Sequence, residues 1–122
     1  MLSEELERFI RKHVKSLSTL EILLLIHRTR ARSWTADELN RELRSSLQLV
    51  AGVLANLERS GLVQRESSER YHWHPARPEL QRMVGQLEET HATYPFSVIR
   101  AIYATHVNQI QALADAFKIK RD

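Results

Sequence analysis

Cysteine is absent from the 122-residue sequence. This absence excludes disulfide scaffolds, thiolate zinc sites and cysteine nucleophiles, and it fits a reducing cytoplasm. Glycine and proline are scarce, at three residues each. Because these two residues interrupt helices most strongly, a chain so poor in them and so rich in Leu, Ala, Glu and Arg is expected to be mostly helical.

Long hydrophobic runs are also missing. The longest, Ile22–Ile26, is far too short to span a bilayer, and the acidic, amphipathic N-terminus is unlike a signal peptide. We therefore predict a cytoplasmic protein with no membrane association. Hydrophobic residues make up 43% of the chain and charged residues 27%, as in folded globular proteins. The length predicts a single domain over residues 1–122.

Catalytic arrangements are missing too. The sequence contains neither a glycine-rich phosphate loop nor a nucleophile with a recognisable base, so we expect a non-enzyme without a cofactor. His72 and His74 alternate on a predicted strand and therefore share one face. Zinc would need at least a third ligand, so a structural role is favoured over a metal site.

What is present is a series of amphipathic helices. Apolar residues recur at helical spacing over 3–17, which predicts an N-terminal helix. Ser18 and Glu21 fit a capping box for a second helix, and this helix is apolar almost all round. We expect it to be the buried centre of the domain.

The middle of the chain predicts a helix-turn-helix followed by a hairpin. Thr35 and Glu38 form a second capping box, with Trp34 and Leu39 at the spacing of a hydrophobic staple, so a short helix begins here and ends near 43 or 44. A new helix begins near Ser46 and ends at Gly61. Strands are predicted over 62–64 and 70–74, separated by the polar turn 66–69.

The C-terminal part predicts further helices and a dimer interface. A helix opens at Pro78, and Tyr94-Pro95 breaks its pattern. Apolar residues then recur in a heptad rhythm interrupted by His106, which is either a pH-sensitive element or a polar residue that fixes the register. This region is one helix, or two with a kink near Thr105. We predict a homodimer through this seam, whose residues are Phe96, Ile99, Tyr103, Ile110, Leu113 and Phe117.

The stretch from Leu17 to Trp73 resembles winged helix-turn-helix transcriptional regulators, broadly of the multiple-antibiotic-resistance-regulator (MarR-like) type. The phrases that carry the resemblance are Thr35-Ala36-Asp37-Glu38-Leu39, Val50 through Leu54, and Leu57 through Arg65, with Glu69-Arg70 similar to the acidic-basic pair at the tip of the family's wing. The resemblance implies a mainly α fold with a small β-hairpin wing. The module would span 18–75, flanked by a helix over 1–17 and dimerisation helices over 76–122.

The resemblance also implies duplex DNA as the partner. The second helix of the motif would enter the major groove, and a wing arginine would enter the minor groove. Carried over position by position, the residues that would face DNA are Ser45, Ser46, Gln48, Leu49, Ala51, Gly52, Ala55 and Asn56 on the reading helix, Arg65 and Arg70 on the wing, and Arg41 and Arg44 near phosphates.

The charge distribution keeps a second function open. Residues 33–75 contain five basic and six acidic residues, which gives a net charge of −1. Residues 1–32 contain seven basic and four acidic residues, which gives a net charge of +3. DNA affinity rests largely on neutralising phosphates, so Arg28, Arg30 and Arg32 are predicted phosphate contacts. The alternative for this cluster is a solvated loop with cations at a helix C-terminus. The alternative for the whole chain is a winged-helix protein-interaction module that uses its small, weakly polar reading face.

Overall fold

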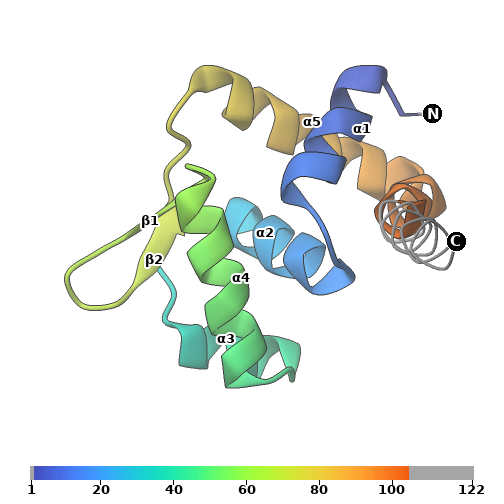
Figure 1. Cartoon of the computed structure of the whole chain (residues 1–122). Helices are drawn as coiled ribbons and strands as arrows, with labels where there is room; N and C mark the ends of the chain where they lie inside the picture. The colour runs from blue at the N-terminus through green and yellow to red at the C-terminus, as the bar shows by residue number, and fades with distance from the viewer. Residues whose placement is uncertain (1, 105–122) are drawn as a thin grey trace, which may run out of the picture.

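The computed structural model describes residues 2–104 and places a small hairpin among the helices (Figure 1). The elements are α1 (Glu4–His13), α2 (Leu17–Arg28), α3 (Ala36–Leu43), α4 (Leu47–Arg59), β1 (Val63–Arg65), β2 (Tyr71–Trp73) and α5 (Pro78–Thr93). A further helical segment covers 95–104. The prediction of a mainly helical chain with a small hairpin is confirmed. None of the described helices is long and apolar enough to cross a bilayer.

Hydroxyl side chains determine where the first four helices begin. Ser3, Ser16, Thr35 and Ser46 each adopt an extended conformation and accept a hydrogen bond from the N–H three residues later. Each bond satisfies a donor that the first turn of a helix leaves without a partner. At Thr35 the bond is reciprocated, because the Glu38 carboxylate accepts the Thr35 N–H at 2.9 Å. The predicted capping box of α3 is therefore confirmed.

The predicted start of α2 at Ser18, with Glu21 as its capping partner, is wrong. The cap is Ser16, whose Oγ accepts the Thr19 N–H at 3.1 Å, and Ser18 lies inside the helix. Correspondingly, α1 ends at His13 and does not reach Leu17. The connection between α1 and α2 contains Val14, whose side chain is completely buried.

The hairpin is joined to the chain that enters α3. Strands β1 and β2 pair antiparallel, with Val63 opposite Trp73 and Arg65 opposite Tyr71. One residue before the cap of α3, Trp34 donates its N–H to the Tyr71 carbonyl at 2.8 Å and accepts the Tyr71 N–H at 2.7 Å. This pair of bonds, the Trp34–Tyr71 bridge, extends the hairpin by one residue on the far side of β2.

Helix α2 lies at the centre of the structure, as predicted from its composition. It packs against α4, α5 and β2. Its buried side chains are Thr19, Leu20, Ile22, Leu23, Leu24, Ile26 and His27. Helices α4 and α5 contribute one buried apolar side each to the same core, through Val50, Val53, Leu54, Leu57, Leu80, Met83, Val84 and Leu87.

One buried histidine links three elements of this core. The His27 side chain of α2 is 6% exposed, and its Nδ1 lies 2.8 Å from the Glu88 carboxylate of α5. The His27 ring also packs edge-on against Trp73 of β2 at a centroid distance of 4.9 Å. The Trp73 indole donates to Gln81 Oε1 of α5 at 2.7 Å. These contacts hold the hairpin against the helical core.

The C-terminal helical segment packs through residues other than those of the predicted seam. Val98 and Ile102 are buried at 0% and 1% exposure, whereas Phe96 and Tyr103 are 76% and 53% exposed. Ile99 is half-buried. The heptad rhythm therefore marks a face of 95–104 that the core does not use. The predicted interface residues Ile110, Leu113 and Phe117, together with Thr105 and His106, lie outside the described residues.

Gly61 allows the first stability prediction. It has φ +79°, and the N–H groups of Gly61 and Leu62 close the end of α4 on the carbonyls of Glu58 and Leu57. An added Cβ would be strained by this φ and would lie 3.1 Å from the Ala76 Cβ. Gly61→Ala is expected to lower the free energy of unfolding in urea by about 1–3 kcal/mol.

Gly85→Ala is the matched control, because Gly85 lies inside α5 with open space around the position of its Cβ. This change is expected to raise the free energy of unfolding by up to about 1 kcal/mol through helix propensity. Equal stability of the two variants would contradict the role given to Gly61.

Candidate nucleic-acid interface

Helix α4 follows α3 after a turn of defined geometry. Arg44 ends α3 in the left-handed conformation, with φ 52° and ψ 48°. Ser46 then caps α4, and its Oγ accepts the Leu49 N–H at 3.2 Å. The turn is therefore stabilised by local bonds at both of its ends, and it directs the first turn of α4 into solvent.

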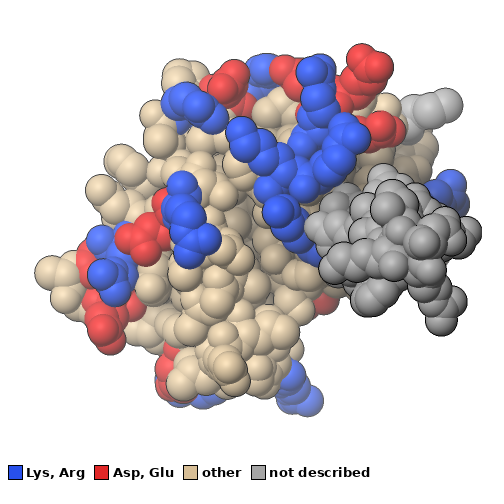
Figure 2. Space-filling model, viewed as in Figure 1, with Lys and Arg blue, Asp and Glu red and all other residues tan. Residues whose placement is uncertain are grey.

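The outward side of α4 contains the predicted reading residues and is apolar. We define the α4 face as the exposed residues Leu47, Gln48, Leu49, Ala51, Gly52 and Ala55. Leu47 and Leu49 are 50% and 41% exposed. No Lys or Arg occurs in α4 before Arg59, its last residue. Figure 2 shows the surface over α4 as mostly uncharged.

The tip of the hairpin is acidic. The turn is closed by the Glu66 N–H, which donates to the Arg70 carbonyl at 2.7 Å, and by the Glu69 N–H, which donates to the Glu66 carbonyl at 3.1 Å. Glu69 has a positive φ of 61°. Arg65 is exposed at the end of β1, next to the turn that contains the exposed carboxylates of Glu66 and Glu69.

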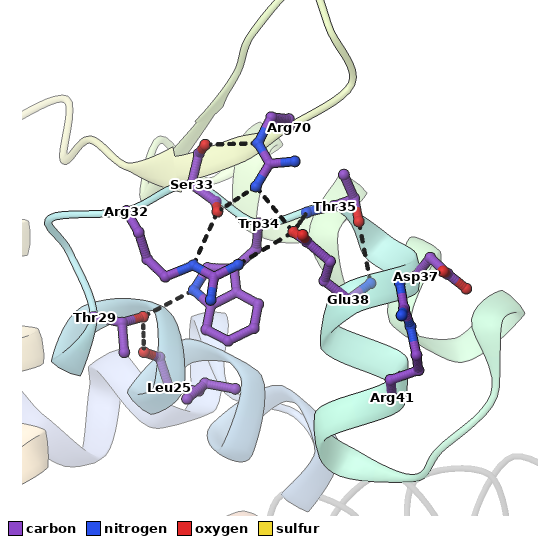
Figure 3. A network of polar contacts seen from close by, with 10 residues as sticks. All are labelled: Leu25, Thr29, Arg32, Ser33, Trp34, Thr35, Asp37, Glu38, Arg41 and Arg70. Atoms are coloured by element: carbon purple, nitrogen blue, oxygen red, sulfur yellow. Dashed lines mark hydrogen bonds and ion pairs between the residues drawn. The ribbon is translucent and has the colours of Figure 1, made fainter.

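The second predicted wing arginine, Arg70, is bound within the protein (Figure 3). Its Nε donates to Ser33 Oγ at 2.9 Å, and its Nη2 donates to the Ser33 carbonyl at 2.9 Å and to Glu38 Oε1 at 3.0 Å. Because Glu38 belongs to the first turn of α3, Arg70 ties the hairpin to the start of that helix. The sequence alone did not distinguish this position from a DNA contact.

The cluster at 28–32 also makes internal contacts. Arg32 lies 3.2 Å from the Glu38 carboxylate and stacks on the Trp34 ring, with its Cζ 3.6 Å from the ring centroid. Arg30 donates to the carbonyl of His27 in the last turn of α2 at 2.9 Å. Arg28 lies 3.8 Å from Glu88. These contacts correspond to the alternative in which the cations stabilise a helix C-terminus.

The remaining predicted cations divide into paired and unpaired groups. Arg41 pairs with Asp37 one turn earlier in α3 at 2.9 Å. Within residues 2–104, Arg44 and Arg65 make no side-chain hydrogen bond or ion pair that would compete with a ligand. They lie at the start of α4 and on the hairpin, so the predicted interface retains one exposed arginine on each of its two parts.

Glu38 is the electrostatic centre of the α3–hairpin contact. The Thr35 backbone N–H lowers the pKa of the Glu38 carboxyl, and the nearby guanidinium groups of Arg70 and Arg32 lower it further. A single carboxylate therefore caps α3 and pairs with two arginines from different segments. Its ionised form is the one that the fold favours.

A basic cleft lies beside α4 and was not anticipated from the sequence. It has a volume of about 450 Å³ and is lined by Lys12, His13, Lys15, Thr19, Asn56, Arg59, Ser60 and Arg77. Figure 2 shows Lys and Arg side chains gathered near the C-terminal end of α1, on the same face of the molecule as α4. The net +3 of residues 1–32 was the sequence feature that pointed towards it, but the contributing residues are distant along the chain.

The histidines of the hairpin do not form a metal centre with neighbouring residues. His72 Nδ1 lies 3.0 Å from the Glu66 carboxylate, and the His72 and His74 rings are 5.7 Å apart. No group of three or more His, Asp or Glu side chains suited to hold a metal ion occurs in the described part of the chain.

The comparisons with known proteins identify no family: no protein-family model matches the chain, and no curated protein matches it.

Glu38→Gln tests the electrostatic centre at the start of α3. Since the pKa of Glu38 is lowered in the folded state, its ionisation contributes stability that is present above the usual value of 4.5 and is lost as the pH falls through the folded-state pKa. We expect Glu38→Gln to melt at a lower temperature than the wild-type protein at neutral pH. The difference should narrow as the pH falls below the usual carboxyl pKa.

The control is Asp37→Asn, which removes the same charge from the neighbouring position. The Asp37 side chain is 64% exposed and pairs with Arg41. Its effect on melting temperature should be smaller. An Asp37→Asn effect as large as that of Glu38→Gln, with the same pH dependence, would contradict the account of Glu38.

Proposed function

We propose that the chain is a winged helix-turn-helix regulator that binds duplex DNA, with α4 in the major groove and the β1–β2 hairpin as the wing. The observation that carries the proposal is the Trp34–Tyr71 bridge, with bonds of 2.8 and 2.7 Å. It joins the entry to α3 to the hairpin, so that α3, α4 and the two strands form one unit. This unit leaves one side of α4 exposed beside the hairpin, which is what groove insertion requires.

The chemistry of the α4 face is compatible with reading bases. The Gln48 amide is suited to bidentate pairing with adenine, and the Leu49 and Ala51 side chains offer apolar contact for a thymine methyl group. Ser45 and Ser46 lie at the N-terminus of α4, where hydroxyl and N–H groups can contact phosphate. Small residues at 51, 52 and 55 allow the helix backbone to approach the base edges closely.

The proposal includes a homodimer. Phe96, Ile99 and Tyr103 recur at helical spacing on a side of the 95–104 segment that the core leaves uncovered, and Phe96 is 76% exposed. Exposed aromatic side chains of this kind are typical of protein–protein interfaces. A two-fold dimer would present two α4 helices to a pseudo-palindromic site.

Selection from random duplexes, followed by mobility-shift titration, tests DNA binding. Gln48→Ala should relax the preference at one base pair, at a cost of about 1–3 kcal/mol for the preferred base. Arg65→Ala should weaken binding with little change in the base preference of α4, because the minor groove, which a wing arginine would enter, distinguishes base pairs only weakly. Arg82→Ala is the control, since Arg82 pairs with Glu5 on α1 and lies outside the proposed interface. Failure of the wild-type protein to retain any duplex at low salt would overturn the proposal.

Phe96→Glu tests the dimer. A charge at the centre of the exposed aromatic face should convert the protein from dimer to monomer, because an unpaired carboxylate is costly to bury. Light scattering coupled to size exclusion measures the mass. Arg100→Glu, at an exposed position of the same segment, is the control and should leave the mass unchanged. A monomeric wild-type protein at high concentration would contradict the dimer.

A protein-interaction module is the second candidate, and a specific observation favours it. Leu47 and Leu49 are exposed beside three small residues, with no cation on the first three turns of α4. Such a face fits the apolar side of an amphipathic helix. The two functions differ in the response to Leu47→Gln, because Leu47 is exposed on this face but is not among the predicted DNA contacts. Partner binding should be lost, whereas DNA affinity, which depends mainly on phosphate contacts, should change little.

A further inference from the structure

We propose that the basic cleft holds a segment of the DNA phosphate backbone beside the base contacts of α4. The proposal rests on the proposed function and adds a second, electrostatic part to its interface. It assigns DNA contacts to Lys12, Arg59 and Arg77, none of which the resemblance implied. The base contacts would then come from the α4 face, and contacts with the DNA backbone would come from the basic cleft.

The cleft is built where the ends of three helices meet. The C-terminal end of α1, the start of α2 and the last turn of α4 line it, together with the segment that leads into α5. The His13 ring connects two of these elements, with its Nδ1 3.2 Å from Ser60 Oγ. Thr19, at 8% exposure, forms part of the buried wall. The cations therefore project from a packed junction of helices.

The charged residues that line the cleft are all basic. Four of its eight lining residues are Lys or Arg, and none is Asp or Glu. Arg77 pairs with Glu79 of α5, whose carboxylate lies 3.4 Å from its Nε, and both side chains of this pair are exposed. Arg59 donates to Asn56 Oδ1 at 2.9 Å, which orients its guanidinium without neutralising it.

The pKa of the His13 side chain is sensitive to these neighbouring charges. Burial lowers the pKa of the His13 imidazole, and the charges of Lys12, Arg77 and Lys15 lower it further. The Phe9 ring on its other side, at a centroid distance of 5.0 Å, has no charge to offset them. An anion in the cleft would relieve this repulsion, since it favours the charged imidazolium.

The position of the cleft favours the DNA backbone over a small anion. It is only partly enclosed, whereas small-ligand sites enclose most of their ligand. Asn56 belongs both to the predicted reading residues and to the lining of the cleft, so the cleft is continuous with α4. The α4 face itself lacks cations, and DNA affinity depends on neutralising phosphates. The cleft supplies that charge on the same side of the molecule (Figure 2).

Lys12→Gln and Arg77→Gln test the proposal in the full-length protein. Both side chains are exposed, so the changes should leave the melting temperature nearly unaltered. Each change should weaken binding to all duplexes and reduce the slope of log K against log salt by about 0.9 for B-DNA, as expected for one lost phosphate contact. Base preference should stay as in the wild-type protein. Arg82→Gln is the matched control for charge.

The outcomes separate this proposal from the proposed function. If the wild-type protein binds DNA and Gln48→Ala alters its base preference, but the cleft variants match Arg82→Gln in affinity and salt slope, the cleft proposal is overturned and the DNA-binding function stands. If the wild-type protein binds no duplex, the function fails and the cleft proposal fails with it.

The His13 pKa, measured by NMR, provides a second readout. Saturating duplex should raise it, because a phosphate in the cleft offsets the neighbouring cations. Inorganic phosphate alone is the comparison. An unchanged His13 pKa in the DNA complex, or a rise produced by inorganic phosphate but not by duplex, would show that the backbone does not occupy the cleft.

Discussion

The pair of backbone hydrogen bonds between Trp34 and Tyr71 is the contact on which the rest of the structure depends. It brings the chain entering α3 against the hairpin, at 2.8 and 2.7 Å. The bridge places Arg70 of the hairpin beside both Ser33 and Glu38. Arg32, from the segment that enters α3, pairs with the same carboxylate and stacks on Trp34. The position of α4 relative to the hairpin follows, because α4 is joined to α3 by a turn that local bonds define at both ends.

This arrangement engages the arginines around α3 in contacts within the protein. Arginines that stabilise the fold have their donors directed at carboxylates and carbonyls, and a phosphate would have to replace those partners. Arg70, Arg32 and Arg41 are of this kind. Other exposed cations lie outside this network, among them Lys12 and Arg59 at the basic cleft, Arg44 before α4 and Arg65 on the hairpin. Structural and electrostatic roles are thus divided between different arginines of the same protein.

The sequence predicted features that depend on neighbours within one turn. The Thr35–Glu38 capping box, the left-handed Gly61 and the start of α5 at Pro78 are all as expected. It failed where the local pattern pointed to residues other than those that the fold uses. The capping-box pattern placed the start of α2 at Ser18, whereas Ser16 is the cap. Along 95–104 the heptad rhythm indicated Phe96 and Tyr103, whereas the core buries Val98 and Ile102 and leaves the two aromatic residues exposed.

The sequence by itself determined the helical character, the order of the helices and the hairpin, and the mostly apolar nature of the α4 face, because periodicity and caps act over a few residues. Only the tertiary structure decided what each charged side chain does. Arg70 and Arg65 flank the same turn, yet one is bonded to Ser33 and Glu38 while the other faces solvent. Lys12, Arg59 and Arg77 become one basic cleft because helix packing brings together segments that are far apart in the chain. Long-range electrostatics depends on distances in space, and local patterns in a sequence do not contain those distances.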